Sequence, residues 1–403
     1  MTTEASAHVP RRAVVAGGGI AGTAAAIALR CAGWTPVIYE AMEPGATERG
    51  VFVTLAVNGV NALRALGLDP AVVLARGFAT PLLALRGASG RLLAEVPLGG
   101  PLPDGTVTTT IRRADLYAAL RAEAGARGVA IVHGHRLRSA TPRPGGVAVR
   151  FENGHETSAD LLVGADGLHS RTRKALDPAA PAPHHLGLLD AGGFTDGPVD
   201  PRLTPPPGVM QMSFGRKAFF GWAAAPDGSV WWFANPPRRR PVESGEFTPA
   251  SWRRYLLDLF ETEPAADLIR ATGDILGPWS TRDLRRVPVW RGDRIVLAGD
   301  AAHAVSPSSG QGASMALEDA VVLGHSLREH AEVPEALAAY VAARRPRVEK
   351  VVEHGRRTSG AKVLGPVGAA VRDAVMPALL RRAHRRGDPQ AWIFDHRLPG
   401  LVP

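Results

Sequence analysis

Residues 294–320 read RIVLAGDAAHAVSPSSGQGASMALEDA, and the rest of the chain is organised around this stretch. Its apolar start, Ile295–Ala298, is typical of a strand buried on both faces. The strand ends at Gly299 and Asp300, a loop rich in Pro, Ser and Gly follows over Pro307–Gly312, and apolar residues at helical spacing come next. The stretch therefore predicts a strand of a parallel sheet, followed by a loop and a helix.

The carboxyl end of this strand predicts a ligand site. Asp300 can accept hydrogen bonds from sugar hydroxyls, and the free N–H groups near Gly310, Gln311 and Gly312 can meet negative charge. For this stretch alone, the alternative to a ligand site is a strand–loop–helix connection whose glycines serve only tight packing. Two other stretches favour the ligand site.

The N-terminal region carries a dinucleotide-binding pattern. An apolar strand, Ala13–Ala16, precedes Gly17, Gly19 and Gly22 in the order G-x-G-x-x-G, and an Ala-rich helix follows. The first glycine permits a tight turn, the second lets a pyrophosphate approach the backbone, and the third lets helix and strand pack closely. The next predicted strand ends in Glu40, at about the distance expected for the acid that binds a ribose. An acid there favours an unphosphorylated adenosine ribose, as in FAD or NAD.

A third apolar strand, Leu161–Val163, leads into Gly164-Ala165-Asp166-Gly167. A buried strand again delivers an Asp and a Gly to a turn before a helix, and Ser170 can cap that helix. The alternative is an Asp-Gly turn with no ligand.

Composition narrows the class of protein. The chain has 403 residues, enough for roughly two domains, and 45% hydrophobic with 21% charged residues is ordinary for a globular protein. The net charge of +9 comes mainly from Arg residues spread along the chain, which favours anionic cofactors over nucleic acid. The single cysteine, Cys31, fits a reducing cytoplasm. No apolar run reaches membrane-spanning length, and His303 has no partner at metal-ligand spacing, so we expect neither integral membrane association nor a metal.

The middle of the chain changes character. Short alternating runs at Met210–Phe214, Ala218–Ala223 and Ser229–Phe233 predict antiparallel strands, and Ser251–Phe260 predicts a helix. Aromatic residues concentrate here, which suits either a pocket for a planar ligand or an ordinary sheet core.

The three motifs in this order resemble those of the class A flavoprotein monooxygenases, the single-component aromatic hydroxylases with the para-hydroxybenzoate hydroxylase fold. The resemblance covers roughly Val14 to Glu353 and is thin over the middle of the chain. Further stretches that look like the family are Asn58-Gly59, Arg113-Ala114-Asp115-Leu116, Glu318-Asp319-Ala320 and Tyr340…Arg344…Arg347.

The resemblance implies an α/β fold with three parts. A Rossmann-like FAD-binding domain would comprise residues 1–75, 105–176 and 285–360. An inserted, mostly antiparallel β-sheet domain for the substrate would comprise residues 76–104 and 177–284. Residues 361–403 would form a C-terminal helical tail.

By the same resemblance the cofactor is non-covalent FAD. Glu40 would bind the adenosine ribose, Asp300 the ribityl chain, and Pro307 and Gly312 would act catalytically beside the isoalloxazine ring. A helix that begins near Gly312 would point its positive end at the ring and favour the anionic reduced flavin. The implied cofactor-binding residues are Gly17, Gly19, Ile20, Ala21, Gly22, Glu40, Arg49, Arg113, Asp166, Gly167, Asp300, Gly310, Gln311, Gly312 and Ala313.

The implied reaction is the hydroxylation of an aromatic or polycyclic small molecule. NADPH or NADH would reduce FAD, O2 would add to the reduced flavin, and the resulting C4a-hydroperoxide would donate one oxygen atom. Alternatives on the same fold are a dehydrogenase or reductase, an epoxidase, and a non-catalytic flavin-binding partner of a biosynthetic enzyme. A flavin halogenase is disfavoured because the text around Trp222, Gly-Trp-Ala-Ala-Ala-Pro, lacks the second Trp and the Ile of the halogenase motif.

The residues that would contact the substrate come from the predicted antiparallel strands and their turns. We expect a monomer or homodimer that acts on a small aromatic molecule. The candidate substrate contacts are Gln211, Arg216, Phe219, Trp222 and Trp232.

Overall fold

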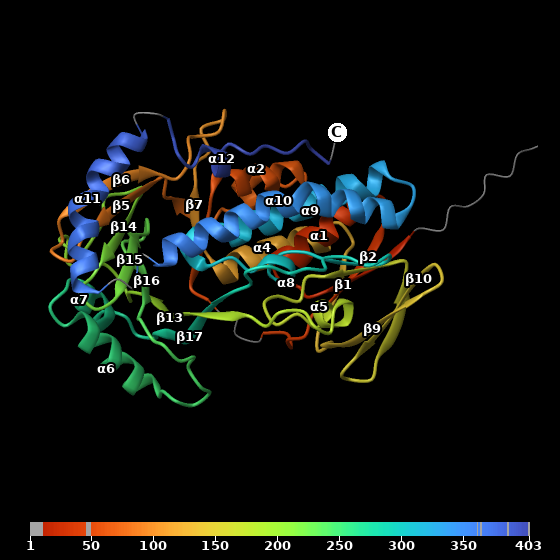
Figure 1. Ribbon diagram of the computed structural model, residues 1–403, viewed down its shortest axis with the longest axis horizontal. Coiled ribbons are helices and arrows are strands. Elements are labelled where there is room, and N and C mark those ends of the chain that lie inside the picture. Colours follow the sequence, from red (N-terminus) through yellow and green to blue (C-terminus); the bar gives the residue numbers. More distant parts are fainter. Residues whose placement is uncertain (1–10, 46–49, 361, 363–364, 385–386, 402–403) are drawn as a thin grey trace, which may run out of the picture.

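The structure is a computed structural model, and it describes the chain apart from residues 1–10, 46–49, 361, 363–364, 385–386 and 402–403. Arg49, one of the predicted cofactor contacts, lies outside the described residues. The molecule is elongated, with a parallel sheet toward one end and a larger, mostly antiparallel sheet at the other (Figure 1).

The parallel sheet has five strands in the order β18-β12-β1-β2-β8. All five strands run in the same direction, so their carboxyl ends meet at one edge. Helices α1 (Ile20–Cys31), α4 (Arg113–Ala126) and α9 (Gly312–Glu329) pack around it through an apolar core. The strands are β1 (Arg12–Ala16), β2 (Thr35–Tyr39), β8 (Ala130–Val132), β12 (Leu161–Gly164) and β18 (Ile295–Leu297).

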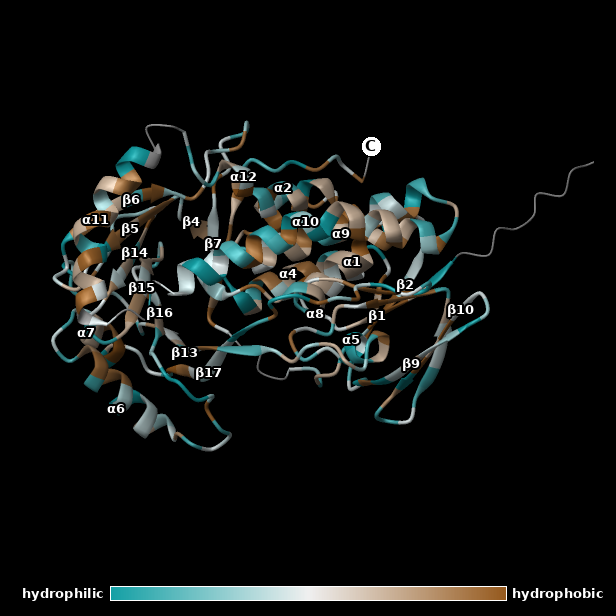
Figure 2. Cartoon of the chain, in the orientation of Figure 1, coloured by the Kyte–Doolittle hydropathy of each residue, from teal (hydrophilic) through white to brown (hydrophobic). Residues whose placement is uncertain are grey.

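The larger sheet has seven strands in the order β17-β13-β16-β15-β14-β5-β6. Neighbouring strands are antiparallel except for the β14–β5 pair, which is parallel. Hydrophobic residues, brown in Figure 2, gather on β5 and β6 at its edge. The strands are β5 (Leu82–Arg86), β6 (Leu92–Pro97), β13 (His184–Phe194), β14 (Val209–Phe214), β15 (Phe219–Ala224), β16 (Val230–Asn235) and β17 (Leu276–Asp283).

The two faces of the larger sheet have different neighbours, because successive side chains of a strand point to opposite faces. One face carries Phe220 and Trp232, which pack under helices α6 (Pro249–Phe260) and α7 (Ala265–Arg270). We call this the helix face. The other face carries Trp231 and Phe233, which contact Phe52 from the nucleotide-binding side. We call this the inner face.

Two small antiparallel sheets complete the strands. One has the order β3-β7-β4, and the other has the order β11-β10-β9. The first lies between the two large sheets, because β3 contacts α4 and α9 on one side and Phe52 of β3 contacts the inner face on the other. The strands are β3 (Phe52–Leu55), β4 (Phe78–Ala79), β7 (Thr109–Arg112), β9 (Leu137–Arg143), β10 (Gly146–Phe151) and β11 (Glu156–Ala159).

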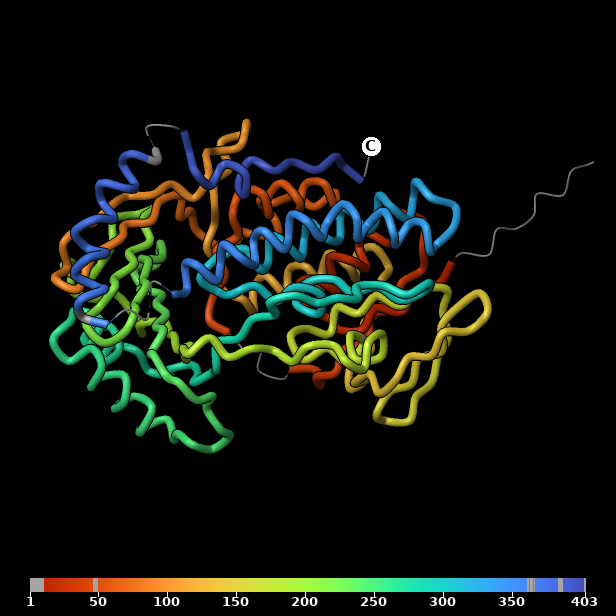
Figure 3. Tube along the Cα trace, viewed as in Figure 1, coloured from red at the N-terminus to blue at the C-terminus, as the bar shows by residue number. Residues whose placement is uncertain are grey.

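The last part of the chain is helical. Helix α10 (Val333–Gly360) runs beside α9, and α11 (Pro366–His384) lies against β6. After α12 (Ala391–Phe394) the chain returns over α2 (Val57–Ala65), where the Leu401 N–H donates to the Ala65 carbonyl at 2.7 Å (Figure 3). The predicted fold class, a Rossmann-like unit with an inserted antiparallel sheet and a helical C-terminal segment, is confirmed. The short helices are α3 (Pro70–Val73), α5 (Arg171–Leu176) and α8 (Asp300–His303), with a 3-10 turn at Pro307–Ser309.

Candidate active site

The three glycine-rich motifs meet at the carboxyl edge of the parallel sheet. Ala16 pairs with Gly164, and Gly164 pairs with Leu297, so the three strands end side by side. The next peptides bond across the strands: the Ala165 N–H donates to the Ala16 carbonyl and the Ala298 N–H to the Gly164 carbonyl. Parallel pairing thus gathers segments that lie far apart in the sequence into one ligand-binding edge.

The glycines of the first motif have distinct steric roles. Gly17 adopts a φ of +102°, and a Cβ there would lie 2.5 Å from the Ala165 carbonyl oxygen. A Cβ on Gly22 would lie 1.8 Å from the Gly17 carbonyl oxygen, so only glycine lets α1 approach β1 this closely. A Cβ on Gly19 would meet only the Tyr117 hydroxyl, at 3.9 Å, which leaves room for a ligand at the start of α1. The tight turn at Gly17 and the close packing at Gly22 are those that the sequence predicts.

Two acidic residues at this edge have backbone partners. Glu40 accepts from the Gly18 N–H at 2.6 Å and from the Met42 N–H at 2.8 Å, so its carboxylate lies beside the glycine turn. Asp166 accepts from the N–H groups of Arg171 at 2.8 Å and Thr172 at 2.9 Å. Asp166 therefore orients the start of α5, with Ser170 as the cap, as predicted.

The third motif leaves Asp300 and the start of a helix open, but the expectation of free N–H groups at Gly310 and Gln311 is wrong. The Gly310 N–H donates to the Pro307 carbonyl at 3.0 Å and the Gln311 N–H to Ser309 Oγ at 3.2 Å, because the chain makes a tight turn there. The Asp300 carboxylate is exposed and has no hydrogen-bond or ion-pair partner among the described residues. Helix α9 begins at Gly312, as predicted, and has neither a side-chain cap nor an acidic residue in its first turn. Helix α1 likewise starts without a side-chain cap. Uncapped helix N-termini present free N–H groups and partial positive charge, which suits a phosphate or an anionic ring.

A buried ionic cluster supports this third motif from behind. Asp319 Oδ2 accepts from the Gly299 N–H at 2.9 Å and contacts His303 Nε2. Asp319 Oδ1 accepts from Arg344 Nε at 2.8 Å, and the same guanidinium donates to Glu318 Oε2 at 2.7 Å. The three charged side chains of Glu318, Asp319 and Arg344 are each at most 1% exposed. The cluster therefore ties the end of β18 to α9 and α10.

The electrostatics of the cluster keep its carboxylates ionised. Burial alone would raise the pKa of Asp319, but His303, Arg344 and the Gly299 N–H together lower it to about 2. Burial also opposes ionisation of Glu318, and hydrogen bonds from Arg347 with the charge of Arg344 lower its pKa overall. The carboxylates of Glu318 and Asp319 therefore stay ionised near neutral pH.

The edge as a whole fits FAD. FAD carries a pyrophosphate, a ribose, a ribityl chain and a flavin ring. The edge offers groups that suit such a ligand: open space at Gly19, carboxylates at Glu40 and Asp300, and two uncapped helix ends. Arg113 Nε donates to the Tyr117 hydroxyl at 2.9 Å, and this hydroxyl is the atom nearest to the open space at Gly19. The cation of Arg113 is therefore close to the proposed pyrophosphate position.

The comparisons with known proteins agree with this geometry. Residues 11–355 match the family model described as FAD binding domain. The chain is 32% identical to the aurachin C monooxygenase/isomerase of Stigmatella aurantiaca, over 88% of this chain and 89% of that protein. It is also 32% identical to a 3-amino-4-hydroxybenzoate 2-monooxygenase of Streptomyces platensis, over 97% of each chain. The structure of Klebsiella pneumoniae HpxO complexed with FAD and uric acid superposes with a TM-score of 0.81 at 25% identity, over 93% of this chain and 94% of that one.

The chain belongs to the class A FAD-dependent monooxygenases.

The monooxygenase therefore uses FAD, and the predicted family, enzyme class and cofactor are confirmed. Among its described helices, none combines the length and the apolar character needed to span a bilayer. Within the same described residues, no group of His, Cys, Asp and Glu is arranged to hold a metal ion.

The structure divides the candidate substrate contacts of this monooxygenase between two faces. Phe219 is on the inner face, where its ring packs with Phe233. Trp222 and Trp232 are on the helix face, where Trp232 is fully buried and donates to Thr272 Oγ1 at 2.8 Å. Gln211 is buried and accepts from Arg86 Nε at 2.7 Å, and Arg216 is exposed in the β14–β15 turn. The predicted set is therefore not brought together at one place.

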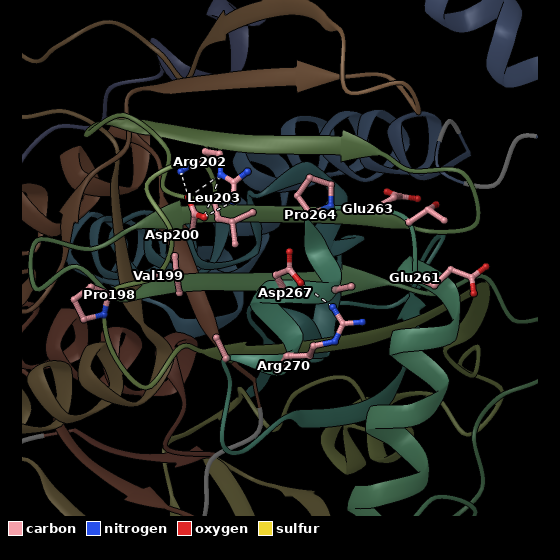
Figure 4. A pocket seen from close by; sticks show the side chains of 13 residues that line it. Pro198, Val199, Asp200, Arg202, Leu203, Glu261, Glu263, Pro264, Asp267 and Arg270 are labelled. Atoms are coloured by element: carbon pink, nitrogen blue, oxygen red, sulfur yellow. Dashed lines mark hydrogen bonds and ion pairs between the residues drawn. The ribbon is translucent and has the colours of Figure 1, made fainter.

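A cavity of about 740 Å³ lies away from the flavin edge (Figure 4). It opens between the loop at Pro198–Leu203 and α7, and its walls carry the ion pairs Arg202–Asp200 and Arg270–Asp267. The residues that line it belong to none of the three glycine motifs. This cavity is separate from the FAD site.

Glu318, Asp319 and Arg344 stand out in the sequence only through the family resemblance, which does not predict their role. Two adjacent acids inside an otherwise apolar helix, with an arginine in the next helix, are the signal for a buried ionic cluster.

Proposed function

We propose that this monooxygenase hydroxylates an aromatic or fused-ring small molecule, with NADPH or NADH as reductant and O2 as co-substrate. FAD, when bound, would supply the redox chemistry between the nicotinamide and oxygen. The observation that carries the proposal is the apolar, aromatic inner face of the larger sheet, which is turned toward the nucleotide-binding side through Phe52. A planar ring that packs on such a face is shielded from water, as oxygen transfer requires.

The residues of this chain would position the cofactor rather than react. We assign the ribityl chain to Asp300, the adenosine ribose to Glu40, and the edge of the flavin ring to Pro307 and the N-terminus of α9. The positive end of α9 would stabilise negative charge on the reduced ring. The ionic cluster behind it would hold that helix end in place while charge develops, since its carboxylates stay ionised.

The remaining assignments of the site belong to the same proposal. Asp166 and Gly167 would lie near the pyrophosphate, and Arg49 and Arg113 would help to hold the FAD. The main-chain N–H groups of Ile20, Ala21 and Ala313 would meet its anionic parts. Gly310 and Gln311 would contact it through other atoms, because their N–H groups already donate within the protein. We further propose the division into an FAD-binding part, an inserted substrate part and a helical tail, with the boundaries predicted from sequence.

The relatives' names support a ring substrate. They specify aurachin C and 3-amino-4-hydroxybenzoate, and HpxO was solved with uric acid. We extend this feature to the substrate of the present enzyme.

The test is NADPH and NADH oxidation by the FAD-loaded enzyme across a panel of phenols, quinolones and fused-ring compounds. At least one compound is expected to raise the rate of reductant consumption and to yield a product heavier by one oxygen atom. Product structure then distinguishes hydroxylation from epoxidation. Reductant consumption that yields only hydrogen peroxide, with no oxygenated product from any compound, would contradict the proposal.

We also propose that the enzyme is a monomer or homodimer in the cytoplasm. The lone Cys31 leaves no intramolecular disulfide, which supports a reducing compartment. Light scattering during size-exclusion chromatography measures the assembly, and a tetramer would contradict this assignment.

A further inference from the structure

The inner face of the larger sheet carries a row of hydrogen-bonded polar side chains among its aromatic residues. Lys362 Nζ donates to Asn235 Oδ1 at 2.6 Å, and Asn235 Nδ2 donates to Asp190 Oδ1 at 2.8 Å. The same ammonium lies 4.0 Å from the centroid of the Phe219 ring and 5.7 Å from that of Phe233. A lysine, an amide and a carboxylate are thus joined in a row beside two aromatic rings.

This row lies next to the turn that carries Pro307. The Lys362 N–H donates to the Ser359 carbonyl at 3.1 Å, near the end of α10. The Ser359 hydroxyl in turn bonds to the Ser306 hydroxyl, immediately before Pro307. The backbone of Lys362, just after α10, is thus linked through Ser359 to the Pro307 turn, while its ammonium lies on the inner face. That is where the proposed function puts the substrate.

The Lys362 ammonium has more hydrogen-bond donors than the described residues accept. A lysine offers three N–H donors, and the described residues accept one of them, through Asn235. Asp190 is the charged group that acts on Lys362; β15 and β16 present Phe219, Phe233 and Asn235, which do not titrate. A partly buried cation beside aromatic rings suits a planar ligand that carries an anionic oxygen.

We propose that Lys362, oriented by Asn235 and Asp190, binds the ionised hydroxyl of a phenolic or enolic ring substrate. The inference rests on the proposed function, because it places the substrate on the inner face. On binding, the O–H bond of the substrate breaks, the proton passes to the Lys362 amine, and the electron pair stays on the oxygen. The ring becomes more electron-rich, which is the state that accepts an electrophilic oxygen atom.

The protonation behaviour of the two ionisable groups supports this step. Burial lowers the pKa of Lys362 to about 7, against the attraction of Asp190, so a neutral amine is available near neutral pH. Burial raises the pKa of Asp190 to about 6, although Lys362 and Asn235 favour its ionised form. An amine with this pKa is matched to a base that works at neutral pH.

The experiment titrates the FAD-loaded enzyme with three probes that share one ring system: 2-naphthol, 2-methoxynaphthalene and 2-naphthoate. Changes in flavin absorbance report binding, and the absorbance of naphtholate reports ionisation of bound naphthol. The wild type is expected to bind 2-naphthol about tenfold or more tightly than the ether, since a hydrogen bond to a charged group is lost with the ether. Bound naphthol is expected to be ionised below its solution pKa.

Lys362→Met should abolish both the preference and the naphtholate signal, whereas Lys362→Arg should keep most of the preference because the charge remains. The matched control is Lys350→Met, since Lys350 lies 4.0 Å from the ring centroid of Trp392 on the exposed side of α10 and should behave as the wild type does. The comparison of naphthol with the ether on the wild type tests the inference even if a variant fails to fold.

Equal binding of naphthol and ether by the wild type, tighter binding of the naphthoate, or an unchanged preference in Lys362→Met would each overturn the inference. So would turnover of a neutral ring compound by an enzyme that binds none of the three probes. The proposed function fails separately, when no ring compound gives an oxygenated product.

Discussion

Replacement of Arg344 by Met tests the buried ionic cluster. The substitution keeps much of the side-chain volume but removes the donors to Asp319 Oδ1 and Glu318 Oε2, which lie at 2.8 and 2.7 Å. Both carboxylates stay buried, since each is at most 1% exposed. Removing one partner of a buried ion pair costs roughly 3–5 kcal/mol, because a charge is left uncompensated. Arg347 still reaches Glu318 and His303 still reaches Asp319, so we expect about 3 kcal/mol.

Chemical denaturation of the FAD-loaded protein measures this loss as a lower midpoint, and a flavin assay measures retention of the cofactor. A loss of about 3 kcal/mol is a large share of the roughly 5–15 kcal/mol that stabilises a typical domain. The control is Arg345→Met on the same helix, because Arg345 pairs at 2.8 Å with the partly exposed Glu349. A partly exposed pair of this kind contributes less than about 1 kcal/mol. If the two variants unfold at the same denaturant concentration, the structural role assigned to the cluster is wrong.

Three further predictions concern the flavin edge. Asp300→Ala should purify mostly without FAD because the carboxylate that we propose contacts the ribityl chain is lost; normal occupancy and turnover would reject that assignment. Gly22→Ala should lose FAD and unfold more easily, since its Cβ would lie 1.8 Å from the Gly17 carbonyl oxygen, whereas Gly125→Ala, with nothing within 4 Å, should be as stable as the wild type by thermal unfolding. Acid should weaken the fold between about pH 4 and pH 2: the pKa of Asp319 falls from 3.8 to about 2 on folding, so its stabilising contribution is present above the first value and lost toward the second. This contribution is roughly 2 kcal/mol by linkage, and an Asp319→Asn protein with the same acid midpoint as the wild type would contradict it.

The outline of the cofactor edge was readable from sequence because its determinants are local. The turn at Gly17 needs a positive φ, the packing of α1 needs Gly22, and each motif sits where a buried strand ends and a helix starts. Such constraints act over a few residues, so the glycines and acids of each motif occur at a fixed spacing in the sequence. The start of α9 at Gly312 and the cap of α5 by Ser170 followed from the same kind of local rule.

The substrate face was decided only by the tertiary structure. Phe219 and Trp232 are both aromatic residues of predicted strands, yet one lies on the inner face and the other under α6 and α7. Strand alternation separates neighbours within one strand, but which face is covered depends on helices and strands from elsewhere in the chain. Lys362 reaches Asn235 across 127 positions, a pairing that no local pattern encodes. Short-range backbone geometry thus determined each motif of the FAD edge, whereas long-range packing brought the motifs together and determined which side chains lie beside them.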